Sequence, residues 1–167
     1  ENWSPRSASH KDEIGSLWGG CGINAEWTRL RKVLLHPPGA ELTALADPES
    51  AQLLEIPGWG LARQQHEAIA LAYRDAGVAV HYVEPEGKPS PNLIFCADLL
   101  FMTPEGAILA RPASTVRAGE ERLVARRLVA LDVPILMSVH GDGVFEGADA
   151  LWIDEGMALV ATGLRTN

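Results

Sequence analysis

A unit of strand, helix and strand recurs along this chain, and that repeat constrains the fold more than any other feature. The first copy opens with the apolar run 30–36, which ends at Pro37, so we expect a buried strand there. An amphipathic pattern over 62–76 predicts a helix that ends at Gly77. The alternating, β-branched run 78–83 then predicts a second strand.

The second copy keeps this order and adds a hairpin. Apolar segments at 99–102 and 107–110 predict two strands joined by a tight turn. A helix is expected over 117–131, and 132–137 predicts the next strand. A third copy begins with a hairpin over 150–161 and has no helix after it. A repeat of about 50–60 residues predicts an α/β fold of radially arranged ββαβ units, which we expect to be cut short here.

Length and composition exclude several classes of protein. The 167 residues suffice for one domain or part of one, and 1–17 are expected to form a polar N-terminal tail. A formal net charge of -8 argues against nucleic-acid binding. No apolar run approaches the roughly 18 residues of a membrane span, and no signal peptide is visible. Two cysteines are too few for a disulfide scaffold, so we expect a cytoplasmic protein.

Two carboxylates lie at the rims of predicted strands, where burial carries a desolvation cost that a partner must offset. Asp98 comes directly before the apolar run 99–102, and Glu146 lies between Phe145 and the small Gly147. Ordinary turn chemistry explains either carboxylate, and Asp149 is a candidate cap for a local backbone group. The residues alone therefore leave a structural and a functional role open.

Three segments, in this order, resemble the guanidino-group modifying enzymes, the superfamily of arginine deiminases and amidinotransferases. They are 18–42, the Asn-x-x-Phe-x-x-Asp pattern at 92–98, and 145–149 followed by 165–167. The resemblance implies the pentein fold, a five-bladed αβ propeller of which this chain supplies about three blades. It also implies that 18–167 are the N-terminal portion of a catalytic domain. A C-terminal segment, missing here or present as a second chain, is expected to complete it.

The resemblance implies a role for each matching polar residue. Asp98 and Glu146 are expected to act in catalysis by holding the substrate guanidinium, a planar, donor-only cation that paired carboxylates grip bidentately. Glu146 is also expected to help manage protons. Arg117 and Arg165 are expected to bind the substrate's α-carboxylate, which favours a free α-amino acid over a decarboxylated ligand such as agmatine. The other expected substrate-binding residues are Asn92, Phe95 and Asp149.

Two residue types need a separate interpretation. Arg117 has an alternative role as a charge on the solvated face of its predicted helix. The nucleophilic Cys and the His of the superfamily have no match, since Cys21 lies in an N-terminal loop and Cys96 lies inside the substrate motif. Cys96 is therefore expected to be a small buried apolar residue, and His140 to be a polar loop residue. We expect the reacting Cys and His to lie outside this chain.

The function that this resemblance implies is hydrolysis of the guanidinium group of arginine or a methylated arginine. The products are citrulline and ammonia or an amine, formed through a Cys-bound thiouronium intermediate. Two alternatives stay open: transfer of the amidino group to an amine acceptor, and a non-catalytic module that binds guanidino compounds. No metal or organic cofactor is implied. The expected partners are a small arginine-like substrate and the C-terminal half of the same protein, with neither nucleic acid nor membrane.

Overall fold

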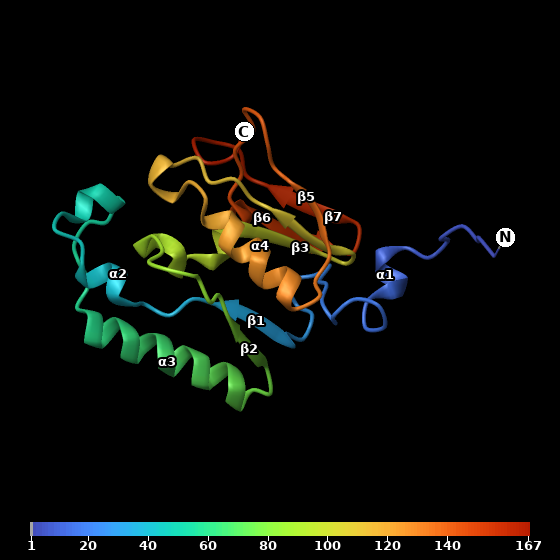
Figure 1. The fold of residues 1–167 in the computed structure, drawn as a ribbon, viewed down its shortest axis with the longest axis horizontal. Coiled ribbons are helices and arrows are strands. Elements are labelled where there is room, and N and C mark those ends of the chain that lie inside the picture. The colour runs from blue at the N-terminus through green and yellow to red at the C-terminus, as the bar shows by residue number, and fades with distance from the viewer. Residues whose placement is uncertain (1) are drawn as a thin grey trace.

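The first predicted unit folds as two parallel strands joined by a long helix. The computed structural model describes residues 2–167 and is drawn in Figure 1. Strand β1 (Lys32–Leu35) pairs in parallel with β2 (Ala79–Tyr82). Helix α3 (Trp59–Asp75) makes the crossover that a parallel pair requires, and the chain turns after it at Gly77. The expected order of strand, helix and strand is confirmed.

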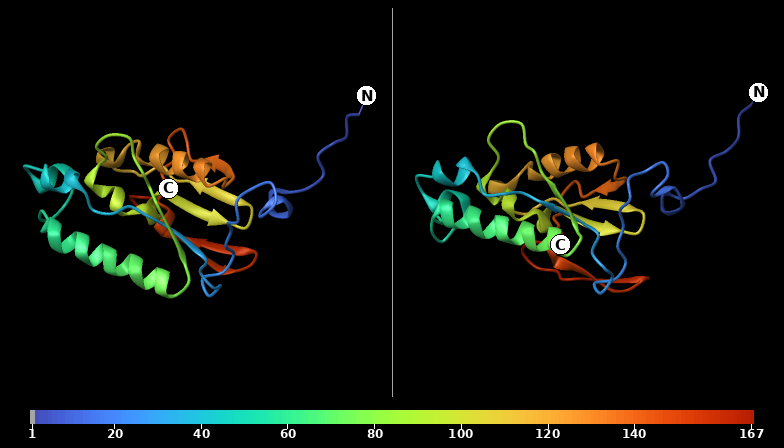
Figure 2. Two further views of the ribbon diagram at one scale, coloured as in Figure 1. Left: turned by 60° about the horizontal axis from the view of Figure 1, so that its bottom comes forward. Right: turned by 90° about the horizontal axis from the view of Figure 1, so that it is seen from below.

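The second unit forms a three-stranded sheet. Strands β3 (Leu100–Thr103) and β4 (Gly106–Leu109) make the expected antiparallel hairpin, and β5 (Ile135–Ser138) pairs in parallel with β4. Helix α4 (Glu120–Ala130) connects β4 to β5. Figure 2 shows this helix lying along the sheet, which it covers on one side.

The hydrophobic core lies between this sheet and α4. Leu93 and Leu99 come from the segment before β3, whereas Val124 and Leu128 share one face of α4 because they are four residues apart. All are buried, and Leu128 is the most exposed of them at 3%. Burying each such side chain stabilises the fold by about 1.5–3 kcal/mol. This core fixes the position of the segment that leads into β3.

A third hairpin lies beside the three-stranded sheet. Strands β6 (Ala150–Asp154) and β7 (Met157–Val160) are antiparallel. Trp152 ties the hairpin to β3, because its ring stacks on Phe101 with centroids 5.3 Å apart and its Nε1 donates to the Met102 carbonyl at 3.0 Å. The hairpin predicted over 150–161 is therefore confirmed.

Short helical segments connect these units. The segment expected to be a polar tail contains α1, whose N-cap Ser9 forms a capping box with Asp12. Glu13 at the end of α1 is buried and accepts hydrogen bonds from Arg6 and Trp18. The short elements are α1 (His10–Glu13), α2 (Ala40–Thr43) and the 3-10 turns η1 (Pro48–Ala51), η2 (Pro91–Ile94), η3 (Cys96–Leu99), η4 (Thr115–Arg117) and η5 (Gly147–Asp149).

The helix expected over 117–131 starts later than predicted. Gly119 adopts φ +89°, in the left-handed region, so a continuous helix cannot pass through it. Turn η4 ends before this glycine and α4 begins at Glu120. Arg117 therefore lies on a separate turn, and the prediction that it belongs to the helix is wrong. Strand β5 also starts later, at Ile135 instead of 132.

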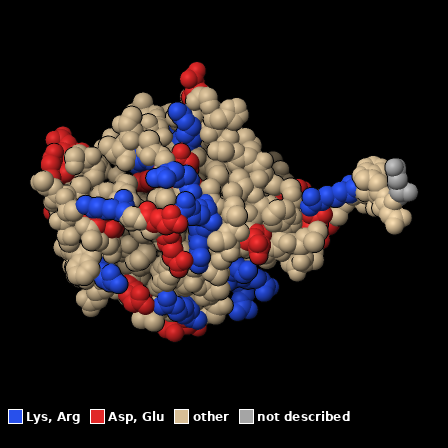
Figure 3. Space-filling model, viewed as in Figure 1, with Lys and Arg blue, Asp and Glu red and all other residues tan. Residues whose placement is uncertain are grey.

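Acidic and basic side chains are mixed on the face shown in Figure 3. On α3, Arg74 pairs with Glu67 at 2.9 Å, and on α4, Arg126 pairs with Glu86 at 2.8 Å. Such exposed pairs contribute little to stability. Among residues 2–167, no helix combines the length and the apolar character that crossing a membrane demands.

Gly147 allows the turn before β6 to pack directly on the turn before β3. A Cβ at this position would overlap the carbonyl oxygen of Leu100 and lie 2.6 Å from that of Ala97. Turns η5 and η3 therefore meet backbone to backbone. This contact places Glu146 beside the segment that carries Asp98.

We expect Gly147→Ala to lower the free energy of unfolding by about 1–3 kcal/mol, because the added Cβ forces two backbone segments apart. Urea unfolding followed by circular dichroism measures this loss. Gly60→Ala on α3 is the matched control, since nothing lies within 4 Å of a Cβ there. Alanine is favoured over glycine inside helices by about 1 kcal/mol, so this control is expected to be neutral or stabilising. A Gly147→Ala protein as stable as the wild type would contradict the close packing.

Candidate active site

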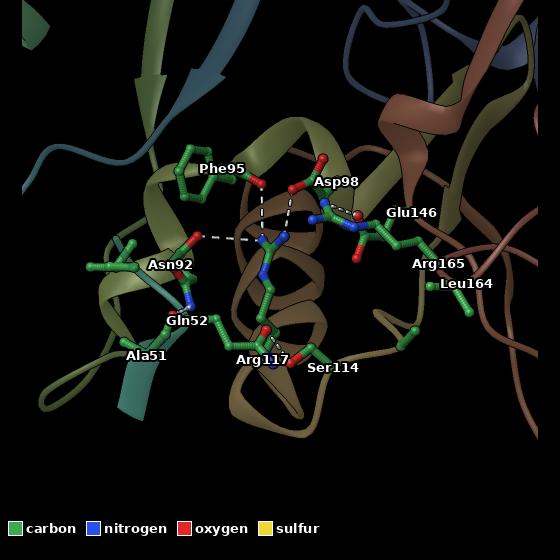
Figure 4. A pocket seen from close by; sticks show the side chains of 12 residues that line it. Ala51, Gln52, Asn92, Phe95, Asp98, Ser114, Arg117, Glu146, Leu164 and Arg165 are labelled. Carbon is green, nitrogen blue, oxygen red and sulfur yellow. Dashed lines mark hydrogen bonds and ion pairs between the residues drawn. The ribbon is translucent and has the colours of Figure 1, made fainter. Parts of the chain in front are cut away.

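A cavity of about 440 Å³ opens where the loop before α3 meets the turns that lead into β3, α4 and β6. Figure 4 shows the side chains that line it. Six residues that the sequence identified are among them: Asn92, Phe95, Asp98, Arg117, Glu146 and Arg165. The other lining residues are Ala51, Gln52, Leu53, Ala113, Ser114 and Leu164. The structure therefore brings residues from four separate places in the sequence, 92–98, 117, 146 and 165, to one site.

Arg117 is the most firmly held side chain in this cavity. It is only 6% exposed, so the alternative that placed it on a solvated helix face is wrong. Its Nη1 donates to the Asp98 carboxylate, and its Nε donates to Glu120 Oε2 at 2.8 Å. Its Nη2 donates to the backbone carbonyls of Asn92 at 3.3 Å and Phe95 at 3.1 Å. The guanidinium thus joins the turns before β3 to the start of α4.

Burial and ion pairing act in opposite directions on this network. Burial opposes the charge of Arg117, but the hydrogen bonds and charges of Asp98 and Glu120 outweigh burial and raise the pKa of its guanidinium. Burial dominates for Glu120 and raises the pKa of its carboxyl group, although Ser90 and Arg117 favour the charged form. Arg117 therefore stays charged, and Asp98 retains a permanent cationic partner.

Glu146 and Arg165 form a second ion pair across the cavity. The Glu146 side chain is 5% exposed, and its Oε2 lies 3.2 Å from Arg165 Nη1. The Arg165 side chain, by contrast, is 71% exposed. A buried carboxylate requires a partner to offset its desolvation, and Arg165 provides it here.

Asp149 lies behind this pair and does not line the cavity. Its Oδ2 accepts a hydrogen bond from Thr166 Oγ1 at 2.6 Å. The same hydroxyl accepts a hydrogen bond from the Glu146 backbone N–H at 3.1 Å. Asp149 therefore supports Glu146 through Thr166. The contact with a substrate that was expected of Asp149 stays a prediction.

Each carboxylate that was expected to hold a substrate guanidinium already faces a guanidinium of the chain itself. Asp98 holds Arg117, and Glu146 holds Arg165, as Figure 4 shows. The cavity thus combines two negative and two positive side chains. Its carboxylates present the geometry that binds a planar, donor-only cation. The contacts that each residue makes to a substrate stay predictions.

The sequence did not predict that the loop before α3 forms part of the cavity wall. The Ala51 carbonyl accepts a hydrogen bond from Asn92 Nδ2 at 2.8 Å. Next to it, Gln52 has a left-handed backbone with φ +56°, and its Oε1 accepts from Ser114 Oγ at 2.8 Å. No sequence pattern around Gln52 predicts these contacts, because the partner residues Asn92 and Ser114 lie far along the chain. Glu120 and Thr166 were also missed, although each follows a predicted site residue closely.

No cysteine or histidine of residues 2–167 lines the cavity. Cys96 is buried in the core, and this burial raises the pKa of its thiol to about 12. His36 is buried at the end of β1, where its Nδ1 lies 3.2 Å from the Val83 carbonyl. Burial lowers the pKa of His36, which favours the neutral ring. Residues 2–167 hold no cluster of three or more side chains suited to bind a metal ion.

Sequence comparison relates this chain to arginine deiminases. The arginine deiminase of Lactococcus lactis subsp. lactis (strain IL1403) is 37% identical over 67 residues, which are 39% of this chain and 16% of the relative. That of Clostridium perfringens (strain SM101 / Type A) is 42% identical over 64 residues, which are 37% of this chain and 16% of the relative. The match thus covers a small part of these proteins. No protein-family model matches the chain.

Solved structures share the fold over most of the chain. Dimethylarginine dimethylaminohydrolase from Pseudomonas aeruginosa, in a mutant complexed with citrulline, has a TM-score of 0.69 at 21% identity. The N-terminal domain of ArgZ, an arginine dihydrolase from cyanobacteria, has a TM-score of 0.67 at 23% identity in a substrate-bound mutant. The chain therefore shares the pentein fold of these structures.

The pentein structures are longer than this chain. The P. aeruginosa match covers 83% of this chain and 52% of the other, and the ArgZ match covers 81% and 50%. The chain therefore spans about half the length of these pentein relatives. The prediction of a pentein-type α/β fold is confirmed, whereas the number of propeller blades stays a prediction.

We expect Cys96 of this pentein chain to resist alkylation in the folded protein. With a thiol pKa of about 12, its thiolate at pH 8 is rarer than that of a free cysteine by on the order of a thousandfold. Iodoacetamide labelling followed by mass spectrometry measures the rate, and the same protein in denaturant gives the unhindered rate. Labelling of folded Cys96 as fast as in denaturant would contradict the buried, uncharged thiol.

Proposed function

We propose that this chain forms the guanidinium-binding part of a guanidino hydrolase that acts on arginine or a methylated arginine. The observation that carries the proposal is the pairing of two carboxylates, the partly buried Asp98 and the buried Glu146, with guanidinium groups inside one cavity. A site that holds an arginine side chain in this way has the charge and the hydrogen-bond acceptors for a substrate guanidinium. The relatives named for acting on arginine and dimethylarginine support the same class of substrate.

In the proposed reaction, the chain binds and orients the guanidinium. Asp98 and Glu146 fix its plane, so that its central carbon faces the direction of attack. Glu146 also accepts or returns a proton as the leaving amine departs. The attacking Cys and the proton-donating His are proposed to lie in the C-terminal segment, which completes the domain formed by 18–167. Overall, water supplies the oxygen of citrulline, and ammonia or an amine leaves.

The two arginines differ in what they can offer to a substrate carboxylate. Arginine has five N–H donors, and Arg117 already makes hydrogen bonds to Asp98, Glu120, Asn92 and Phe95. In residues 2–167, Arg165 makes a single side-chain hydrogen bond, to Glu146. Arg165 is therefore the main proposed ligand of the α-carboxylate, and Arg117 mainly sets the position of Asp98.

A non-catalytic module that binds guanidino compounds is the second candidate. The absence of Cys and His from the cavity lining of residues 2–167 favours it. Release of citrulline from arginine by the natural protein would exclude this candidate. Amidino transfer to an amine acceptor stays a prediction from the sequence, which an acceptor-dependent loss of arginine without citrulline would support.

We expect Asp98→Asn and Glu146→Gln each to lower kcat/KM for arginine by at least about 100-fold. Each change keeps the shape but removes a charge-assisted hydrogen bond worth about 1.5–3 kcal/mol and misaligns the reacting carbon. Citrulline production in the natural protein is the measurement, and circular dichroism verifies folding. Glu155→Gln, in the exposed turn between β6 and β7, is the matched control and should keep the wild-type rate. Near-normal turnover by a folded Asp98→Asn or Glu146→Gln protein would refute that assignment.

A further inference from the structure

The two ion pairs of the cavity differ sharply in how firmly they are held. Arg117 has two carboxylates and two carbonyls around its buried guanidinium. Arg165 has one contact, at 3.2 Å, and its side chain is 71% exposed. Breaking the ion pair of an exposed arginine costs little free energy, because water solvates the freed guanidinium. Arg165 is therefore the member of the site that can move.

Glu146 cannot move in the same way. Its side chain is 5% exposed, and its backbone N–H is held by Thr166. Among residues 2–167, Arg165 is the one cation within ion-pair distance of it. A buried carboxylate without a partner is costly, so Glu146 needs a guanidinium whether or not a ligand is present.

We propose that Arg165 is the resident guanidinium of the empty site and that a ligand guanidinium replaces it on Glu146. This inference rests on the proposed function, in which Glu146 holds the substrate guanidinium. No covalent bond changes in the exchange. One guanidinium leaves the Glu146 carboxylate as another arrives, so the buried negative charge is never left unpaired.

The exchange makes the two ends of a ligand interdependent. The ligand guanidinium must displace Arg165, which costs part of its binding free energy. A carboxylate at the other end of the ligand then captures the freed Arg165 and recovers that cost. Arg165 therefore selects zwitterionic guanidino acids in two ways: it binds their carboxylate, and it competes with ligands that carry only a guanidinium.

Arg165→Ala separates these two roles because they predict opposite effects on two ligands. Arginine carries the carboxylate, so its binding should weaken by roughly 10- to 100-fold. Agmatine lacks the carboxylate and loses only its competitor, so its binding should tighten by roughly 2- to 10-fold. Calorimetric dissociation constants for the natural protein measure both, with KM used for arginine and an inhibition constant for agmatine if the protein turns arginine over.

Two further variants make the outcome decisive. Arg126→Ala removes an equally charged, ion-paired and exposed arginine that does not line the cavity, and it should change neither ligand's binding. Arg165→Gln replaces Arg165→Ala if the alanine variant does not fold, and it should show the same opposite shifts. Unchanged or weaker agmatine binding, together with weaker arginine binding, would refute the exchange while leaving the proposed function intact. Failure of the wild-type protein to bind either guanidino compound would refute the proposed function itself.

Discussion

The buried guanidinium of Arg117 is the interaction on which the rest of this site depends. Its hydrogen bonds reach turn η3 through Asp98, the preceding turn through the Asn92 and Phe95 carbonyls, and helix α4 through Glu120. Removing one partner from such a buried pair costs about 3–5 kcal/mol, because a charge is left without compensation. Arg117 is therefore both a structural link between turns and the reason that Asp98 has a defined orientation.

Charge balance explains how a small cavity can hold so many ionised groups. Two carboxylates in one cavity would repel each other if no cations lay between them. Arg117 and Arg165 supply the compensating charges, one from a buried turn and one from an exposed segment. The difference in exposure between the two arginines divides the site into a rigid pair and an exchangeable pair.

Much of the fold could be predicted because its signals are local. The apolar run before Pro37 and the amphipathic pattern over 62–76 depend on neighbouring residues, and both formed the expected elements. The left-handed Gly119 was missed because one glycine carries no sign of its backbone angle, and it moved Arg117 off the helix. The contact between Gln52 and Ser114 joins residues 62 positions apart, so no sequence window contains it.

In the candidate site, too, local motifs could be predicted from the sequence, whereas contacts between distant residues could not. The motifs around Asp98 and Glu146 placed both carboxylates in one cavity, as expected from the resemblance. The pairing of each with an arginine of the same chain could not be read from the motifs, because it depends on distances across the fold. The role of Thr166 could not be predicted for the same reason. Its hydroxyl bridges the Glu146 backbone N–H and the Asp149 carboxylate, and this contact exists only in the folded chain.

The cavity wall made by the loop before α3 has a consequence for how such sites diversify. A change at Arg117 disturbs several partners, because its guanidinium contacts Asp98, Glu120 and two backbone carbonyls. Gln52, Leu53 and Ala113 also line the cavity and carry no charge. Substitutions at these loop positions can change the shape of the cavity without altering Asp98, Arg117, Glu146 or Arg165.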